Sequence, residues 1–555
     1  MKRWGKWILP FVFTLFSCNI ITPAEDSRPS SPETSSQDTS EAASESEYSS
    51  PEASTSVEKD EQGFIVLPDG YFEHETRPHS FGADVATKQK APNMRLYLGD
   101  EQVPVYGVYV NQTRRWDPEA KIRDLSGVAS VSISQGAKFS IATTWVVGEG
   151  RCKIKPLNKE VPMTFDEVHR VVHFEITEPG DYVIEYRGNR MLHLFVHSYE
   201  ATCPYNESNS IYFGPGVHNK NNDSRLASNS TIYLSSNQTV YLAEGAFVEA
   251  AFVSTNTQNV KILGPGFIDG SVFDRNASKN TRFIPFDFTD CSGFLFSSFA
   301  VLDPAGWCFN LYFCHDFELR GVKVISSRSN GDGISLQSCR NALVDGCFTR
   351  TYDDSIVVKN YPRWNNRSVE GVTENVEVRN CLIWTDLAQS MEVGYETVGT
   401  TMRQIYFHDN IVLAAYHKAV LSIHNANNAN IRDVRFEDII IENLQTGQGD
   451  GSPYLLEFTV AHSPTWSDQH KVTGLGDIDG VKVKNIKILS GLKSPGIIIR
   501  GSMEERSTYP HVAYEIFNVS MDNLDNQGTR ITKDYTNFTL AYAHNVTVDG
   551  TAVSL

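Results

Sequence analysis

Short runs in which apolar and polar residues alternate recur through the second half of the chain. They begin at Phe294, Phe317, Ala342, Val376, Ile405, Val434, Val481 and Tyr514, with 23 to 47 positions between successive first residues. Such alternation predicts β-strands with one buried face. Because no helical pattern separates the runs, they are typical of a parallel β-solenoid, in which each coil stacks on the last. We predict an all-β chain with this solenoid over residues 206–555.

The segment before the solenoid has a different pattern. Alternating runs between residues 63 and 205, such as Val171–Ile176 and Leu192–Val196, are separated by turns. Short strands with Gly and Pro between them predict an antiparallel β-sandwich. Because the end coil of a solenoid exposes its core, we expect the sandwich to cover the first coil. Contact with carbohydrate is the alternative role.

Residues 1–18 have the pattern of an export signal. Lys2, Arg3 and Lys6 precede an apolar run over residues 7–16, and Cys18 follows. The pattern resembles a lipoprotein-type signal peptide that would leave a lipid on Cys18, and a plain signal peptide is the alternative. No later stretch reaches the ~20 apolar residues of a membrane span. We expect an exported, cell-surface lipoprotein, or a secreted or periplasmic protein, that meets the membrane only through this anchor.

Residues 19–62 form an acidic segment rich in Ser, Glu, Thr and Pro. They carry about half of the chain's net charge of −18 and few large apolar residues. Such a segment cannot offset the entropy lost on ordering, so it is predicted to be a disordered tether. The remaining chain has no basic stripe, which argues against a nucleic-acid partner.

Nine cysteines are present, and eight of them follow Cys18. Cys152 and Cys203 are a possible disulfide pair within the sandwich of an exported chain. We interpret the six in the solenoid as small apolar fillers of its interior. No spacing of Cys or His indicates a zinc site, so neither a metal nor a cofactor is predicted.

Three aspartates within residues 330–359 are the candidate reactive groups. Asp332 follows the turn signal Asn330-Gly331, and Asp353 and Asp354 follow it by 21 and 22 positions, each cluster leading into a β-branched run. If one coil has this length, the carboxyl groups lie about 4.8 Å apart along the stack, with Asp332 nearly on top of Asp353. Taken alone, each cluster is more simply a turn or a polar strand entry.

Clustered carboxyl groups suit one chemistry in particular. Like charges a few ångströms apart cannot all ionise easily, so their pKa values separate. One protonated and one ionised carboxyl group supply the acid and the base that hydrolysis of a glycosidic bond needs. Adjacent strand residues point to opposite faces, so Asp353 and Asp354 both reach one cleft only if the backbone bends there.

Asn330-Gly331-Asp332-Gly333-Ile334, followed by Asp353-Asp354-Ser355-Ile356, resembles the β-helix glycosidases of glycoside hydrolase families 28 (polygalacturonases) and 49 (dextranases). The predicted sandwich and segments such as Met391–Thr397 favour family 49. The resemblance implies a right-handed parallel β-helix, a pectin-lyase-like solenoid, and an inverting mechanism. Asp353 would be the general acid, while Asp332 and Asp354 would hold and deprotonate the attacking water.

Two departures from the polygalacturonase pattern bear on the substrate. Ala388-Gln389-Ser390 stands where those enzymes have Gly-His-Gly, and Ser422-Ile423-His424 stands where they have Arg-x-Lys. A sugar carboxylate would then lack a charge-assisted partner. We therefore expect a neutral polysaccharide, such as a dextran-like α-glucan, with a uronic-acid polymer as the alternative.

Aromatic platforms with hydrogen-bonding neighbours bind sugars. The candidate aromatic residues are Trp307, Tyr361, Trp364, Trp384, Tyr395 and Tyr416, and the candidate polar contacts are Lys359, Gln389, Glu392, Glu396, His417 and His424. We expect a monomer acting on a polysaccharide or oligosaccharide. Two other functions stay open: a Ca²⁺-dependent polysaccharide lyase, whose aspartates would ligate the metal, and a non-catalytic glycan-binding surface protein.

Overall fold

The computed structural model describes residues 58–66, 94–118, 120–187, 190–200, 207–275, 283–361, 371–463, 474–506 and 509–553. The predicted signal peptide with Cys18, most of the predicted tether, Cys203 and Trp364 lie outside these residues. Strand β1 (Glu58–Lys59) falls within the range predicted as tether and pairs antiparallel with β2 (Ile65–Val66). The described chain is all-β apart from two 3-10 turns, Leu157–Lys159 and Glu207–Asn209.

Two five-stranded sheets form the N-terminal sandwich. One has the order β4-β3-β7-β10-β9 and the other β5-β6-β12-β11-β8. The strands are β3 (Met94–Leu98), β4 (Glu101–Val103), β5 (Tyr106–Val110), β6 (Asp124–Ile133), β7 (Ala137–Thr143), β8 (Cys152–Lys155), β9 (Met163–Asp166), β10 (Val171–Ile176), β11 (Gly180–Tyr186) and β12 (Arg190–Ser198). Alternate residues of both sheets, such as Leu96, Phe139 and Leu194, fill the core between them.

One strand pair departs from the predicted antiparallel arrangement. β6 and β12 run parallel, with Leu192 opposite Gly127 and Ser198 opposite Ile133. Parallel neighbours need a long crossover rather than a hairpin. The chain supplies it by building β7, β9 and β10 into the other sheet between these two strands.

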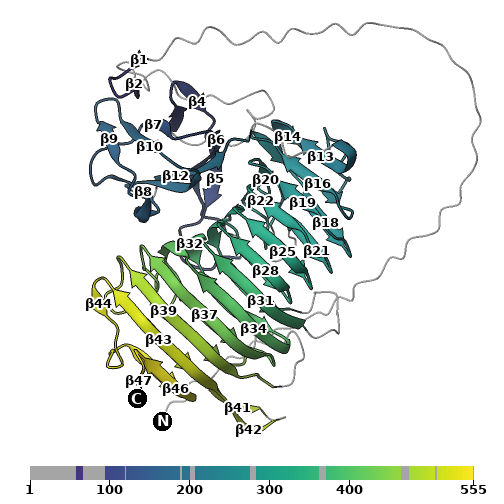
Figure 1. Ribbon diagram of the computed structural model, residues 1–555, viewed down its shortest axis with the longest axis vertical. Coiled ribbons are helices and arrows are strands. Elements are labelled where there is room, and N and C mark those ends of the chain that lie inside the picture. Colours follow the sequence, from purple (N-terminus) through teal and green to yellow (C-terminus); the bar gives the residue numbers. More distant parts are fainter. Residues whose placement is uncertain are drawn as a thin grey trace, which may run out of the picture. The chain divides into compact units, whose positions relative to one another are not determined.

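The C-terminal part is a parallel β-helix, and Figure 1 shows its strands stacked side by side from β13 to β46. A 22-stranded sheet contains β13 (Ser210–Phe213), β14 (Gly216–His218), β16 (Thr239–Leu242), β17 (Ala246–Val248), β19 (Lys261–Leu263), β20 (Phe267–Asp269), β22 (Leu295–Ser297), β23 (Ala300–Leu302), β25 (His315–Arg320), β26 (Lys323–Ile325), β28 (Arg340–Asp345), β29 (Phe348–Tyr352), β31 (Gly371–Arg379), β32 (Leu382–Leu387), β34 (Gly399–His408), β35 (Ile411–Ala415), β37 (Asn430–Ile441), β39 (Ile478–Ile488), β43 (Ile516–Asn526), β44 (Thr529–Arg530), β46 (Ala543–Val548) and β47 (Thr551–Ala552). An 11-stranded sheet contains β15 (Thr231–Tyr233), β18 (Ala251–Thr255), β21 (Phe286–Thr289), β24 (Phe309–Tyr312), β27 (Ile334–Gln337), β30 (Ile356–Asn360), β33 (Met391–Thr397), β36 (Leu421–Asn425), β38 (Tyr454–Val460), β40 (Gly496–Arg500) and β45 (Phe538–Ala541). A separate hairpin joins β41 (Ser502–Arg506) to β42 (Tyr509–Tyr514).

Each middle coil has three strands, as in β28, β29 and β30. Every strand pairs in parallel with its equivalent one coil on, for example Val344 of β28 with Val378 of β31. Alternate side chains point inward, so a continuous apolar column that includes Val344, Val378 and Phe407 fills the interior. The predicted fold class, a sandwich followed by a parallel β-helix, is confirmed.

The six solenoid cysteines lie in this column. Cys291, Cys308, Cys314, Cys339, Cys347 and Cys381 are buried free thiols within the apolar core. Cys152 is likewise a buried free thiol, in the sandwich. The thiols of the β-helix therefore act as small apolar side chains, as the sequence predicted.

The sandwich reaches the first coil through Val217 of β14, but it also packs along the sides of several further coils, where the sequence predicted a cover for the first coil alone. One cluster of buried side chains joins sandwich residues such as Tyr106 and Phe195 to Phe247, Phe348 and Trp384, which belong to coils along the length of the β-helix. Lys155 of β8 donates to the carbonyl oxygen of Leu413 at 2.5 Å, several coils beyond the first. The physical reason is that the second strands of these coils, β17 to β35, carry large apolar residues on their outer face, and the sandwich buries them.

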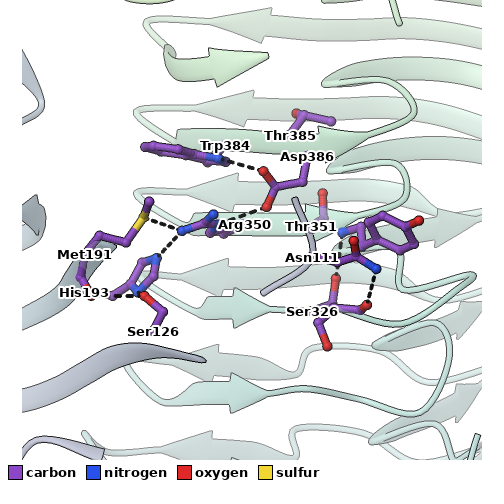
Figure 2. Close-up of polar contacts among 12 residues, drawn as sticks. Asn111, Ser126, Met191, His193, Ser326, Arg350, Thr351, Trp384, Thr385 and Asp386 are labelled. Carbon is purple, nitrogen blue, oxygen red and sulfur yellow. Dashed lines mark hydrogen bonds and ion pairs between the residues drawn. The ribbon is translucent and has the colours of Figure 1, made fainter. Parts of the chain in front are cut away.

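A buried polar network ties the same two parts together (Figure 2). The Arg350 Nε lies 3.0 Å from Asp386 Oδ2, and its Nη1 lies 3.3 Å from the Nε2 of His193 in the sandwich. Burial and the neighbouring Arg350 charge lower the pKa of His193 to about 3, so the ring is neutral and accepts from Arg350. Since His193 Nδ1 is 2.9 Å from the Gly127 carbonyl oxygen, both ring nitrogens are satisfied.

In the part of the chain that the structure describes, no helix has the length and apolar character needed to cross a membrane.

Candidate active site

A cavity of about 650 Å³ opens along successive connections between the second and third strands of the coils. Its wall includes Asp332 before β27, Asp353 and Asp354 before β30, Gln389 before β33 and His417 before β36. The full lining is Trp116, Trp307, Asn330, Asp332, Asp353, Asp354, Lys359, Tyr361, Leu387, Ala388, Gln389, Tyr395, Glu396, His417, Lys418 and Asp450. Stacking thus brings one type of connection, repeated in each coil, to a single opening.

The three aspartates lie in that opening, with a register that differs by one residue from the prediction. The ladder between β27 and β30 pairs Ile334 with Ile356, so Asp332 is level with Asp354 rather than with Asp353. The Gly333 amide donates to the Asp354 carbonyl oxygen at 2.8 Å, which extends the pairing back to the acids. Strand pairing sets a coil length of 22 residues here. Counting from Asp332 to Asp353 gave 21, one residue too few.

Asp353 and Asp354 both line the cavity because neither lies in a strand. β29 ends at Tyr352 and β30 begins at Ile356, and the backbone turns between them. The Thr351 hydroxyl donates to the Asp353 carbonyl oxygen at 2.8 Å, and the Asp354 amide donates to Asp353 Oδ1 at 3.1 Å. These bonds fix the bend that lets adjacent carboxyl groups face the same side.

Lys359 holds one of the acids in place. In β30, Ile356 and Val358 point into the core, so alternation turns Lys359 outward, toward the cavity. Its Nζ lies 3.1 Å from Asp332 Oδ2, 3.4 Å from Glu396 Oε2 and 4.3 Å from the centre of the Trp307 ring. A buried ammonium group therefore sits between two carboxylates and on an aromatic face.

A β-bulge brings Glu396 to this position. Val358 pairs with Val393 and Asn360 with Thr397, so β33 carries two extra residues opposite Lys359. The irregularity places Tyr395 and Glu396 beside Lys359, where both line the cavity. Bulges next to reactive groups commonly redirect side chains in this way.

The three aspartates have raised pKa values, with burial as the main cause in each, but their charged neighbours differ. Burial and the charge of Asp332 raise the pKa of Asp353 to about 7. Burial and the charges of Glu392 and Asp353 raise the pKa of Asp354 well above its usual range. Burial also raises the pKa of Asp332, but the Lys359 charge opposes that rise. Near neutral pH the trio therefore holds at least one proton, while the salt bridge to Lys359 favours the ionised form of Asp332.

Comparison with known proteins gives a relationship of fold. Residues 215–448 match the model of the family described as Glycosyl hydrolases family 28. Among solved structures, Dex49A from Penicillium minioluteum matches with 12% identity over 83% of this chain and 96% of that chain, at a TM-score of 0.51. The chain has the parallel β-helix glycoside hydrolase fold. The predicted resemblance to these enzymes is thereby confirmed.

Two further structures are similar at lower TM-scores. The hyperthermoactive exopolygalacturonase from Thermotoga maritima has 17% identity over 62% of this chain and 84% of that chain, with a TM-score of 0.43. The family 28 exopolygalacturonase from Yersinia enterocolitica has 12% identity over 76% of this chain and 95% of that chain, also at 0.43. No curated protein matches the chain.

Within this glycoside hydrolase fold, ten of the fifteen residues named as candidates for catalysis and sugar binding line the cavity. They are Asp332, Asp353, Asp354, Lys359, Tyr361, Gln389, Tyr395, Glu396, His417 and Trp307. Trp384 and Tyr416, named only as candidate platforms, instead pack at the interface with the sandwich, where Trp384 is almost fully buried.

Glu392 and His424 lie behind the cavity wall. His424 Nδ1 is 2.7 Å from Glu392 Oε1, and its Nε2 is 3.4 Å from Glu457 Oε2. Burial alone would lower the pKa of His424, but these carboxylates raise it to about 9. The charged ring stacks on Tyr395 with centroids 4.2 Å apart and planes within 5°. His424 therefore packs against the face of the Tyr395 ring, and Glu392 holds His424 in that position.

Two polar groups at the His417 end of the cavity complete the wall. His417 Nδ1 accepts from the Ala388 amide at 3.1 Å, so its Nε2 carries the proton and donates to Asp450 Oδ1 at 2.7 Å. Burial lowers the pKa of His417, which keeps the ring neutral. Lys418, beside it, is partly exposed.

Sequence reasoning missed Trp116, Lys418 and Asp450. Lys418 adjoins the predicted His417 and could have been found from it. Trp116 had no such signal, because it lies in the connection between two strands of the sandwich. Asp450 stands in the triplet Gly449-Asp450-Gly451, which repeats the Gly-Asp-Gly around Asp332 and could have pointed to it. Among the described residues, no group of three or more His, Cys, Asp and Glu side chains has the arrangement of a metal site.

Proposed function

We propose that the protein is an inverting O-glycosyl hydrolase that cleaves a neutral polysaccharide. The observation that carries this proposal is a group of three aspartates in one cavity, all with raised pKa values. One of them, Asp332, forms a salt bridge with the buried Lys359. Glycoside hydrolysis needs a protonated and an ionised carboxyl group on either side of the scissile bond. The fold and the family match support the same class of reaction.

The electrostatics support separate roles for the acids. Asp353, with a pKa of about 7, carries a proton under mildly acidic conditions and can give it to the leaving oxygen. Asp332, whose ionised form Lys359 favours, can accept a proton from water. Asp354, level with Asp332 in the ladder, would position that water with it. The resemblance implies the same acid, Asp353, and the same base, Asp332. It also gives Asp354 a share in deprotonating the water, whereas the raised pKa of Asp354 favours a protonated group that only positions the water.

A neutral substrate suits the charges of the cavity. Five carboxyl side chains line it, from Asp332, Asp353, Asp354, Glu396 and Asp450, against two lysines, Lys359 and Lys418. Lys359 is already engaged by two of the carboxylates. The sugar carboxylate of a uronic acid would meet like charges in most directions. An α-glucan such as dextran is therefore the substrate class that we propose.

Lys418 favours a second candidate. Its ammonium group makes no hydrogen bond or salt bridge to any residue that the structure describes, although it lines the cavity beside His417. An unpaired cation in a binding cavity can hold a sugar carboxylate. A hydrolase of a uronic-acid polymer is therefore the alternative.

A polysaccharide panel separates these functions. We expect the purified protein to release reducing ends from a neutral α-glucan, to leave polygalacturonate intact, and to give products of inverted anomeric configuration by NMR. Cleavage of polygalacturonate that Lys418→Met abolishes would establish the alternative. Release of an unsaturated, ultraviolet-absorbing product, in a reaction that a chelator stops, would instead indicate a lyase. Binding without cleavage of any polymer would refute the hydrolase.

The rate should depend on pH in a bell-shaped manner. The general acid must be protonated, so kcat should fall as the pH rises through about 7, the pKa of Asp353. The base must be ionised, so kcat should also fall at acidic pH as the trio takes up a further proton. Measuring kcat from pH 4 to pH 9 tests this expectation. A rate that keeps rising to pH 9 would contradict Asp353 as the acid.

A further inference from the structure

The connection between β5 and β6 reaches from the sandwich to the cavity. Thr113 Oγ1 lies 3.1 Å from the hydroxyl oxygen of Tyr352. Tyr352 directly precedes Asp353 and Asp354 in the sequence. That hydroxyl also donates to the carbonyl oxygen of Arg115. At the far end of the connection, Ser329 Oγ donates to the Pro118 carbonyl oxygen at 2.8 Å. The connection is therefore anchored to the coils that carry Asp332 and Asp353.

A second set of contacts anchors the same connection farther along the β-helix. The Arg114 guanidinium forms a salt bridge with the buried Asp386 and lies 3.8 Å from the centre of the Tyr416 ring. Gly449 passes so close that a Cβ atom there would lie 1.6 Å from the Arg114 carbonyl oxygen. Only glycine allows this approach, and its φ of +69° is one that other residues rarely adopt.

These anchors hold one large side chain over the cavity. Trp116 lines the cavity together with Asp353, Asp354 and Asp450, yet 51% of its surface is exposed. Its backbone amide also donates to the Asp450 carboxylate. A folded protein gains little from leaving an indole in solvent at the end of a fixed loop. An exposed indole beside carboxyl groups has the form of a sugar-binding platform.

We propose that the sandwich supplies a subsite in which Trp116 stacks on a pyranose ring of the polysaccharide. The inference rests on the proposed hydrolase function and extends it. The tryptophans lining the cavity come from different parts of the chain, Trp307 from the β-helix and Trp116 from the sandwich. The sandwich is then a determinant of substrate binding and product length, because a chain that occupies the cavity contacts both parts.

Kinetics of Trp116→Ala in the full-length protein test the subsite. Loss of an aromatic platform should raise KM for the polysaccharide roughly tenfold. The kcat should fall much less, and the distribution of product lengths should shift. Trp116→Phe should recover most of the affinity, because a phenyl face also stacks on sugars. The thermal unfolding temperature should stay close to that of the wild type, since the indole is half exposed.

Ile122→Ala provides the matched control. Ile122 lies in the same connection, is 68% exposed and does not line the cavity. The subsite is refuted if Trp116→Ala cleaves the polysaccharide with the KM and product lengths of Ile122→Ala, or if Trp116→Phe is as impaired as Trp116→Ala. A wild-type protein that cleaves no polymer would instead overturn the hydrolase proposal and, with it, this subsite.

Discussion

Asp353→Asn is expected to lower kcat for the polysaccharide by about 10³-fold, within the range that one acid–base group contributes. Asparagine keeps the shape of the side chain but cannot give a proton to the leaving oxygen. The substitution also removes one of the interacting carboxyl groups from a buried site, so it should not lower stability. Reducing-end assays and thermal unfolding of the variant measure the two effects.

The same variant can identify which carboxyl group is the acid. With a substrate whose leaving group needs no proton, such as a glycosyl fluoride, Asp353→Asn should recover most of its rate. Asp332→Asn should stay impaired, because the attacking water still needs a base. Asp316→Asn, in β25 of the coil that carries Asp332 but outside the cavity and 58% exposed, is the control and should keep the wild-type rate. Equal rescue of the Asp353 and Asp332 variants would refute the assigned roles.

Lys359→Met is expected to lower the free energy of unfolding by about 3–5 kcal/mol, the cost of breaking a buried ion pair from one side. The variant leaves Asp332 and Glu396 buried without their ammonium partner. Activity should also fall, because the pKa of Asp332 would rise and the base would be protonated at neutral pH. Urea unfolding followed by fluorescence, together with kcat, measures both losses.

The stability loss should depend on pH in a defined direction. Without Lys359 the folded-state pKa of Asp332 rises further above its unfolded value of about 4. Stability from a raised carboxyl pKa is present at low pH and is lost as the pH rises through the folded value. The deficit of Lys359→Met should therefore be smallest near pH 4 and grow toward pH 8. A deficit that shrinks with rising pH would contradict this account.

A surface lysine and a double variant serve as controls. Lys482 forms a 2.8 Å pair with Glu437 but is 40% exposed, so Lys482→Met should cost less than about 1 kcal/mol. Adding Glu396→Gln to Lys359→Met removes one unpaired carboxylate and should recover part of the stability. It should not recover kcat, because Asp332 still lacks its partner.

The interior of the β-helix was predictable because its cause is local. Inward residues alternate with outward ones along every strand, so the runs at Ala342 and Val376 mark stacked strands before any contact is known. Asp332, Asp353 and Asp354 could be grouped for the same reason, since a repeat of one coil puts equivalent residues side by side. Their predicted register was wrong by one residue, because it was taken from the spacing of the aspartates, whereas the pairing of β27 with β30 determines which residues lie level.

The contacts around the acids could not be predicted. The bulge in β33 that sets Glu396 beside Lys359 has one mark in the sequence, Gly394 inside the strand, but this glycine does not tell which residues of the neighbouring coil the bulge will face. His424 has the charge of a cation only because Glu392 and Glu457 surround it. Such effects depend on burial and on neighbours from other coils, which spacing along one chain does not encode.

The sequence by itself determined the coil, its apolar interior and the common location of the three aspartates, because each follows from a short-range period of residues. Only the tertiary structure decided where the sandwich lies, and hence that Trp116 joins the cavity and that the sandwich packs along several coils rather than on the first alone. The physical reason is that docking depends on the match between two outer surfaces. Each surface is assembled from residues hundreds of positions apart, and no local pattern records that they will meet.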